Sequence, residues 1–141
     1  ALERFAGPGV RFLGTFPQAD LAPIYSQGSV FVLPSIADGF GMVVTQALAC
    51  GLPAIVSANV GAADVIREGE NGFVIPIRDV GALKDRLERL YRDPALRRHM
   101  SQTAARDAGT SLSWNAYGER LASFLQTVVQ STRQPGITGS N

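Results

Sequence analysis

A glycine-rich turn between an apolar strand and an apolar helix constrains the fold of this chain most strongly. Val30–Leu33 is a continuous apolar run, typical of a strand buried on both faces of a parallel sheet, and Pro34-Ser35 ends it. Gly39 and Gly41 then permit backbone conformations and close approaches that side chains would obstruct. The helix that follows begins with N–H groups that lack partners within the helix, so this turn can bind a phosphate.

Two polar residues flank this turn and are placed to share one crevice. Asp38 directly precedes Gly39, and Gln46 follows Asp38 by eight positions, about two helical turns. Both can therefore face the carboxyl end of the strand, where α/β sheets bind ligands. A carboxylate accepts hydrogen bonds, and an amide also donates them, which suits sugar hydroxyls. The alternatives are ordinary turn glycines and, for Gln46, a helix position in water.

The rest of the chain alternates short strands with helical stretches, which is typical of an α/β sheet. Strands are predicted at residues 10–13, 30–33, 54–56 and 73–75. Helices are predicted at residues 19–27 and 41–50, with a short helical turn at residues 62–67. The C-terminal half is predicted to be helical, with Asp93-Pro94 as a cap followed by proline at the first helical position and Ser113 as the N-cap of the last helix.

Composition predicts a single globular domain. The 141 residues are 45% hydrophobic and carry a net charge of +1. This suffices for one core and gives no reason to expect nucleic-acid binding. Cys50 is the only cysteine and lies among small apolar residues at a helix end, where it is expected to be part of the core. Residues 1–130 are predicted to form the domain, and residues 131–141, which lack periodicity, a disordered tail.

The succession of these segments resembles the donor-sugar half of the retaining, glycogen-synthase-like group 1 glycosyltransferases of GT-B architecture. The likeness rests on Pro-Ser, an acidic residue, Gly-Phe-Gly and a helix ending Ala-x-Ala-x-Gly-x-Pro. It extends upstream to residues 10–14, downstream through residues 60–66 and 70–75 to Ser113-Trp114, and so covers residues 9–128. It implies an α/β fold: a Rossmann-like parallel sheet of about four strands with a helical C-terminal half, as a partial C-terminal GT-B domain.

The resemblance also implies a site. In such enzymes this half binds a nucleotide-activated sugar, and the Gly-Phe-Gly backbone meets the pyrophosphate. It implies a catalytic role for Asp38 and donor contacts by Gly39, Phe40, Gly41, Met42, Gln46 and Asp64. For Asp64, which follows a predicted strand and the Gly61 turn, helix capping is an equal alternative. N–H dipoles and cations, with no metal ion or other cofactor, are expected to stabilise the charge of the departing phosphate.

Two positions depart from the family pattern. Family members carry a glutamate on each side of the Gly-Phe-Gly turn and its helix, where this chain has Asp38 and Gln46. Asp38 keeps the charge with one methylene less reach, whereas Gln46 loses the charge that in the family contacts the ribose hydroxyls. A charge-assisted hydrogen bond is about twice as strong as a neutral one. We therefore expect weakened or altered donor binding.

The resemblance implies an enzyme of hexosyltransferase type in carbohydrate biosynthesis, which transfers a sugar from a nucleotide-sugar to an acceptor. Family members also have an N-terminal acceptor domain and, near the start of the donor domain, an arginine and a lysine that contact the pyrophosphate. Residues 1–9 resemble neither, so the isolated chain is expected to be inactive. The alternative is a non-catalytic nucleotide-binding or assembly module. A flavodoxin-like regulator is a weaker alternative, because the acidic cluster and lysine of a phosphoacceptor domain are not visible.

Location and assembly are also predicted from the sequence. No apolar run reaches the length of a transmembrane helix, so a cytoplasmic location is expected, with the parent enzyme possible at the membrane periphery. Two central strands of the family's sheet have no counterpart in this sequence, which would leave Val30–Leu33 as a sheet edge. Either residues 10–13 pair with that edge, or two chains form a homodimer through it. The homodimer is favoured.

Overall fold

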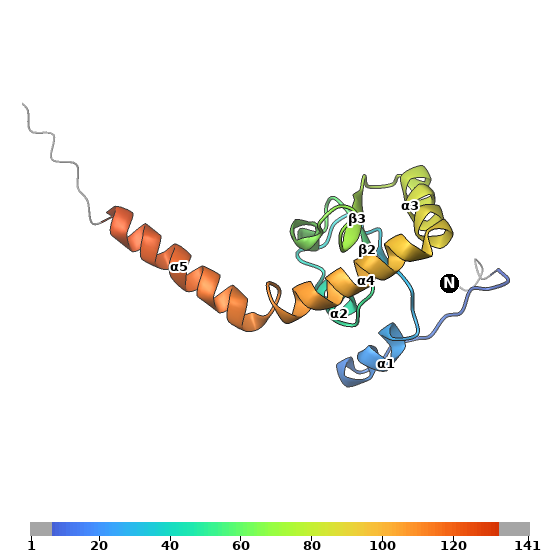
Figure 1. Ribbon diagram of the computed structural model, residues 1–141, viewed down its shortest axis with the longest axis horizontal. Helices are drawn as coiled ribbons and strands as arrows, with labels where there is room; N and C mark the ends of the chain where they lie inside the picture. Colours follow the sequence, from blue (N-terminus) through green and yellow to red (C-terminus); the bar gives the residue numbers. More distant parts are fainter. Residues whose placement is uncertain (1–6, 133–141) are drawn as a thin grey trace, which may run out of the picture.

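The computed structural model describes residues 7–132, and a three-stranded parallel sheet lies at its centre (Figure 1). The strand order is β1 (Phe31–Leu33), β2 (Ala54–Ser57) and β3 (Gly72–Ile75), and both pairings are parallel. Parallel neighbours require a crossover between them, and α2 (Met42–Ala49) supplies the one from β1 to β2. The expected Rossmann-like α/β fold is confirmed.

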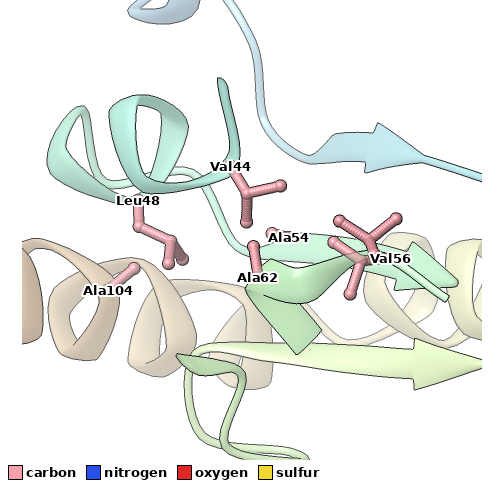
Figure 2. Packing of buried hydrophobic residues seen from close by; sticks show 7 residues of the cluster. Val44, Leu48, Ala54, Val56, Ala62 and Ala104 are labelled. Atoms are coloured by element: carbon pink, nitrogen blue, oxygen red, sulfur yellow. The ribbon is translucent and has the colours of Figure 1, made fainter. Parts of the chain in front are cut away.

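Strand β2 is the buried centre of the domain. Its four side chains are at most 1% exposed, because helices cover both faces of the sheet. On one face α2 packs against β2, together with residues from the loop after β2 and from α4 (Pro94–Gly109). Figure 2 shows this cluster, which includes Val44, Leu48, Ala54, Val56, Ala62 and Ala104.

The second face of the sheet packs against α3 (Val80–Arg92) and α4. Ile55 of β2 and Phe73 of β3 lie there with Leu90 of α3 and Met100 of α4, all of them almost fully buried. Helix α4 therefore contributes to both clusters and joins the two layers. This packing holds the strands, and with them the loops that leave their carboxyl ends, in a fixed arrangement.

The helix ends follow the predicted capping residues. The Asp93 carboxylate accepts a hydrogen bond from the Leu96 N–H at 2.8 Å, and Pro94 is the first residue of α4. At the start of α5 (Trp114–Thr132), the Ser113 hydroxyl accepts one from the Ala116 N–H at 3.2 Å. Both capping predictions are confirmed. A 3₁₀ turn, η2 (Gln18–Asp20), and α1 (Leu21–Tyr25) occupy the helix predicted at residues 19–27.

Helix α5 projects away from the body of the domain (Figure 1). Its first residue, Trp114, is 76% exposed. The other large apolar side chains of α5 that are exposed to solvent are Tyr117, Leu121, Phe124, Leu125, Val128 and Val129. These apolar side chains of α5 remain largely exposed. No helix among residues 7–132 is long and apolar enough to cross a membrane.

The prediction of a strand at residues 10–13 is wrong, so the sheet has three strands and not about four. This segment has no regular secondary structure, and Val10, Phe12 and Leu13 are about half exposed. An apolar pattern forms a strand only where a neighbouring strand offers hydrogen bonds, and none of the strands described in residues 7–132 pairs with this segment. The alternative in which residues 10–13 pair with β1 is therefore also wrong. Strand β1 pairs with β2 alone and is an edge of the described sheet.

The predicted tail, residues 131–141, lies outside the described residues from residue 133 onward. Ser131 and Thr132 are the last two residues of α5.

Candidate functional site

The glycine turn is held at the carboxyl edge of the sheet by backbone pairing with a second loop. Asp38, after β1, forms a parallel bridge with Val60, after β2. The Asp38 N–H donates to the Asn59 carbonyl, and the Gly61 N–H donates to the Asp38 carbonyl, both at 3.2 Å. Parallel sheets of this type bind ligands at the carboxyl ends of their strands. The predicted turn therefore lies where such a site is expected.

Gly61 makes this pairing possible, and the sequence reasoning did not single it out as a site residue. A Cβ atom added to Gly61 would lie 2.3 Å from the Gly39 carbonyl oxygen, which is backbone and cannot move aside cheaply. The neighbouring Ala62 N–H donates to the Phe40 carbonyl at 2.6 Å. In the sequence, Gly61 is a single glycine after a β-branched residue, and this pattern is too common to identify a site residue. The second loop thus fixes the course of the first.

The two glycines of the turn have different roles. Gly41 has a φ of +77°, and an added Cβ would lie 2.8 Å from a methyl carbon of Val60, so this position requires glycine on both grounds. An added Cβ at Gly39 would meet no atom within 4 Å. The backbone of Gly39 therefore faces open space. A ligand can approach it closely.

The N-terminus of α2 offers hydrogen-bond donors beside Gly39. Gly41 is the N-cap and has no side chain to satisfy the first turn. The N–H groups of Met42 and Val43 have no hydrogen-bond partner among the described residues, whereas that of Val44 donates to the Gly41 carbonyl at 2.8 Å. Free N–H groups and the positive end of the helix dipole favour an anion at this place.

Asp38 is exposed at the start of the turn and keeps part of its hydrogen-bonding capacity. Its Oδ1 atom accepts a hydrogen bond from the Phe40 N–H at 3.2 Å, which holds the carboxylate over the turn. Its Oδ2 atom has no partner among residues 7–132. That oxygen can accept a hydrogen bond from a ligand hydroxyl.

Gln46 holds a buried polar atom without a partner. Its Oε1 atom is buried and accepts no hydrogen bond in the described part of the chain. Gln46 follows Met42 by one helical turn and so lies on the same side of α2. No hydrogen bond joins Gln46 to Asp38 within residues 7–132. A buried acceptor left unsatisfied costs about 1–3 kcal/mol, so native proteins seldom keep one without a reason.

Asp64 lies in the loop that pairs with the turn, within η3 (Gly61–Val65). Its side chain is exposed and makes no hydrogen bond or ion pair among the described residues. The N-cap position of η3 is Val60, which has no capping side chain. Nothing therefore supports the capping alternative, and the Asp64 carboxylate is free to contact a ligand at this edge.

A network behind this loop fixes its far end. The Asp107 carboxylate of α4 accepts hydrogen bonds from Arg67 at 2.6 Å and from the Asn71 amide at 3.0 Å. The same amide donates at 3.2 Å to the carbonyl of Val65, which is the last residue of η3. Asn71 is only 1% exposed. Through these bonds α4 sets the position of the segment that carries Asp64.

A cavity of about 390 Å³ opens beside the turn, between α2 and the start of α5. Phe40, Met42 and Trp114 give it a largely apolar lining, and among residues 7–132 Arg120 is the only charged residue that lines it. The Arg120 guanidinium donates to the Ser111 carbonyl at 2.7 Å and has no carboxylate partner among the described residues. No local sequence pattern predicts this cavity, because its walls come from segments that are far apart in the chain.

Comparison with known proteins identifies a family. The family described as "Glycosyl transferases group 1" matches residues 1–107. The chain is 37% identical over 112 residues to the D-inositol 3-phosphate glycosyltransferase of Thermomonospora curvata, covering 79% of this chain and 26% of that protein. It is 31% identical over 138 residues to the enzyme of the same name from Corynebacterium efficiens, covering 97% of this chain and 32% of that protein.

Solved structures show the same fold. A sucrose-phosphate synthase from Thermosynechococcus elongatus matches with a TM-score of 0.75 and 30% identity, over 89% of this chain and 31% of that chain. Anabaena Alr3699/HepE in complex with UDP-glucose matches with a TM-score of 0.74 and 21% identity, over 89% of this chain and 35% of that chain. The chain thus spans about a third of these structures and between a quarter and a third of the two relatives named above.

Proposed function

Because this chain belongs to the group 1 glycosyltransferases, we propose that its carboxyl-edge turn binds the nucleotide-sugar donor of a retaining glycosyltransferase. The diphosphate meets the backbone at Gly39 and the free N–H groups at the start of α2. Asp38 contacts the transferred sugar, and Gln46 and Asp64 accept hydrogen bonds from donor hydroxyls. N–H dipoles and cations of the protein, with no metal ion, stabilise the charge that develops on the departing phosphate.

The unpartnered Oε1 atom of Gln46 carries this proposal. A buried acceptor without a hydrogen bond gains the most when a donor is brought to it, and a vicinal diol supplies two. Because Oε1 has almost no exposed surface, the Gln46 side chain must turn toward the ligand to meet the diol. The open face of Gly39 and the free N–H groups of Met42 and Val43 lie one to two helical turns from it, beside the same helix end. Anion-binding and hydroxyl-binding groups thus occur together, as a sugar nucleotide requires.

We further propose that the chain on its own binds the donor weakly and transfers no hexosyl group. The chain covers 26% and 32% of the two relatives named above, so most of their length has no counterpart in it. Among the described residues Arg120 is the only cation that lines the cavity beside the turn. UDP should therefore bind with a dissociation constant of about 1 mM. We propose that the parent protein is a cytoplasmic enzyme of carbohydrate biosynthesis.

Substitution of Gln46 tests the donor site, with opposite effects expected on binding and stability. Gln46→Leu removes the unsatisfied acceptor and should raise the free energy of unfolding by about 1 kcal/mol, while it weakens UDP binding several-fold. Gln46→Glu should tighten UDP binding several-fold, because a carboxylate forms charge-assisted hydrogen bonds with the ribose hydroxyls. Calorimetric titration with UDP and with UDP-glucose, alongside denaturant unfolding, measures both quantities.

Thr127→Val is a matched control, because Thr127 lies on exposed α5 and its hydroxyl bonds only its own helix. It should leave UDP binding unchanged. Equal UDP affinity in all three variants would contradict the proposed donor site. Low-micromolar UDP affinity of the parent chain would contradict the proposed weak binding. Product formation from UDP-glucose above a heat-treated sample would contradict the proposed inactivity.

The free edge of β1 predicts how the isolated chain associates. Among the described residues β1 pairs on one side only, and the N–H and C=O groups on its other side can pair with another chain. We propose a symmetric homodimer through this edge and expect a dimer in sedimentation velocity at micromolar concentration. Val32→Pro removes a backbone donor at the edge and should shift the chain to the monomer, whereas Leu121→Ala on α5 should not. A parent chain that stays monomeric at 100 times that concentration rules the dimer out.

A further inference from the structure

A second cavity, of about 350 Å³, lies at the opposite edge of the sheet from the glycine turn. Its walls include Gly28 and Ser29, which precede β1, and Gly51, which precedes β2. The first turns of α4 close its other side. The cavity is thus built at the amino ends of the strands, whereas the proposed donor site is at their carboxyl ends.

The charged lining of this cavity is entirely positive. Arg97 and Arg98 of α4 line it, and no aspartate or glutamate of the described part of the chain does so. The Arg97 guanidinium is partly buried and donates to the Leu90 carbonyl at 2.6 Å, which orients it. Arg98 has no hydrogen bond or ion pair from its side chain among residues 7–132. The nearest carboxylate along the chain, Asp93, is outside the lining and caps the Leu96 N–H.

Neutral donors complete the cavity. The hydroxyls of Ser29 and Ser101 line it and have no hydrogen-bond partner in the described part of the chain. Gly51 has a φ of +75°, and an added Cβ would lie 3.4 Å from the Ser101 hydroxyl oxygen. The backbone of Gly51, which carries no side chain, therefore faces the Ser101 hydroxyl and leaves room beside it. Two guanidinium groups with two free hydroxyls form a set that gives many hydrogen bonds and no negative charge.

We propose that this cavity binds a phosphate group, either free phosphate or a small phosphate monoester. A guanidinium matches phosphate in geometry and charge, and its charge-assisted hydrogen bonds are about twice as strong as neutral ones. Serine hydroxyls donate to the remaining phosphate oxygens. The volume exceeds that of one phosphate and admits a short esterified group. Because the cavity and the glycine turn lie at opposite sheet edges, phosphate here does not compete with a nucleotide at the turn.

Titration of the full chain with sodium phosphate at constant ionic strength, against sodium chloride, tests this site. Calorimetry and amide NMR shifts should show a dissociation constant of about 1 mM for phosphate and no saturable binding of chloride. The shifted amides should include Gly51, Ser29 and Ser101. Glycerol 3-phosphate separates the two sources: tighter binding than phosphate indicates a monoester as the ligand, and equal binding indicates free phosphate.

Two substitutions and one control make the test specific. Arg98→Gln should weaken phosphate binding at least tenfold, and Ser101→Ala several-fold, because both groups face the cavity. Arg92→Gln makes the same change of charge on α3, where Arg92 pairs with Glu88, and should leave binding unchanged. UDP binding should be the same in the parent chain and in Arg98→Gln. Equal loss in Arg92→Gln and Arg98→Gln, or phosphate binding no stronger than chloride binding, would overturn the site.

Discussion

Gly61→Ala is expected to lower the free energy of unfolding by about 3 kcal/mol. The added Cβ would lie 2.3 Å from the Gly39 carbonyl oxygen, so the two loops must separate and break the backbone bonds that join them. UDP binding should be lost with them. Denaturant unfolding followed by far-ultraviolet circular dichroism measures the stability, and calorimetric titration measures the binding.

Gly39→Ala is the matched control for Gly61→Ala. The same methyl group meets no atom within 4 Å at Gly39, so the free energy of unfolding should change by less than about 1 kcal/mol. UDP binding should nevertheless fall, because the methyl group occupies the space over which the diphosphate approaches. If Gly39→Ala were to destabilise the chain as much as Gly61→Ala, the described pairing of the two loops would be wrong. Unchanged UDP binding in Gly39→Ala would instead count against the donor site.

Asp107→Ala should lower the free energy of unfolding by about 2 kcal/mol. Asp107 and Asn71 are buried, and the substitution leaves the Asn71 amide with one bond fewer and Arg67 without its partner. The Arg67 side chain is 52% exposed, so solvent screens its ion pair and most of the expected loss comes from the amide and from the lost packing. Thermal unfolding by calorimetry checks the value.

The matched control for Asp107 is Asp85→Ala, on the exposed side of α3, where the carboxylate makes no contact with a partner among residues 7–132. It should change stability by less than about 0.5 kcal/mol. The Asp107 variant should also bind UDP more weakly than Asp85→Ala does, because Asn71 holds the end of η3 that carries Asp64. Equal stability of the two variants would mean that the network does not hold this loop.

The turn and its helix were predictable because their signals are local. Val30–Leu33 is apolar without interruption, and Gly41 adopts a left-handed conformation of the kind that glycine permits. Gly51 follows α2 with a φ of +75°. Caps at Asp93 and Ser113 involve residues at most three positions apart. Such features depend on one segment of chain, so a sequence can specify them alone.

Features that depend on distant partners were missed. The apolar pattern at residues 10–13 is that of a strand, but a strand needs a neighbour that the local pattern cannot report. The need for Gly61 arises from a loop 22 positions earlier, and the Asp107 network joins residues 36 to 40 positions apart. The lack of a hydrogen-bond partner for the Gln46 Oε1 atom likewise depends on the residues packed around it. The fold class and the turn were therefore predictable, and the contacts that position the site were not.

The exposed base of α5 determines what optical probes report on this chain. Trp114 is the only tryptophan, it is 76% exposed, and its ring contact is with Tyr117 of the same helix. We therefore expect its fluorescence emission to report the unwinding of α5, an element held by few tertiary contacts. The emission should change little when Phe73 or Leu48 leaves the core. Fluorescence and heat-capacity transitions of this chain need not coincide. Their separation would measure the cooperativity between the projecting helix and the sheet.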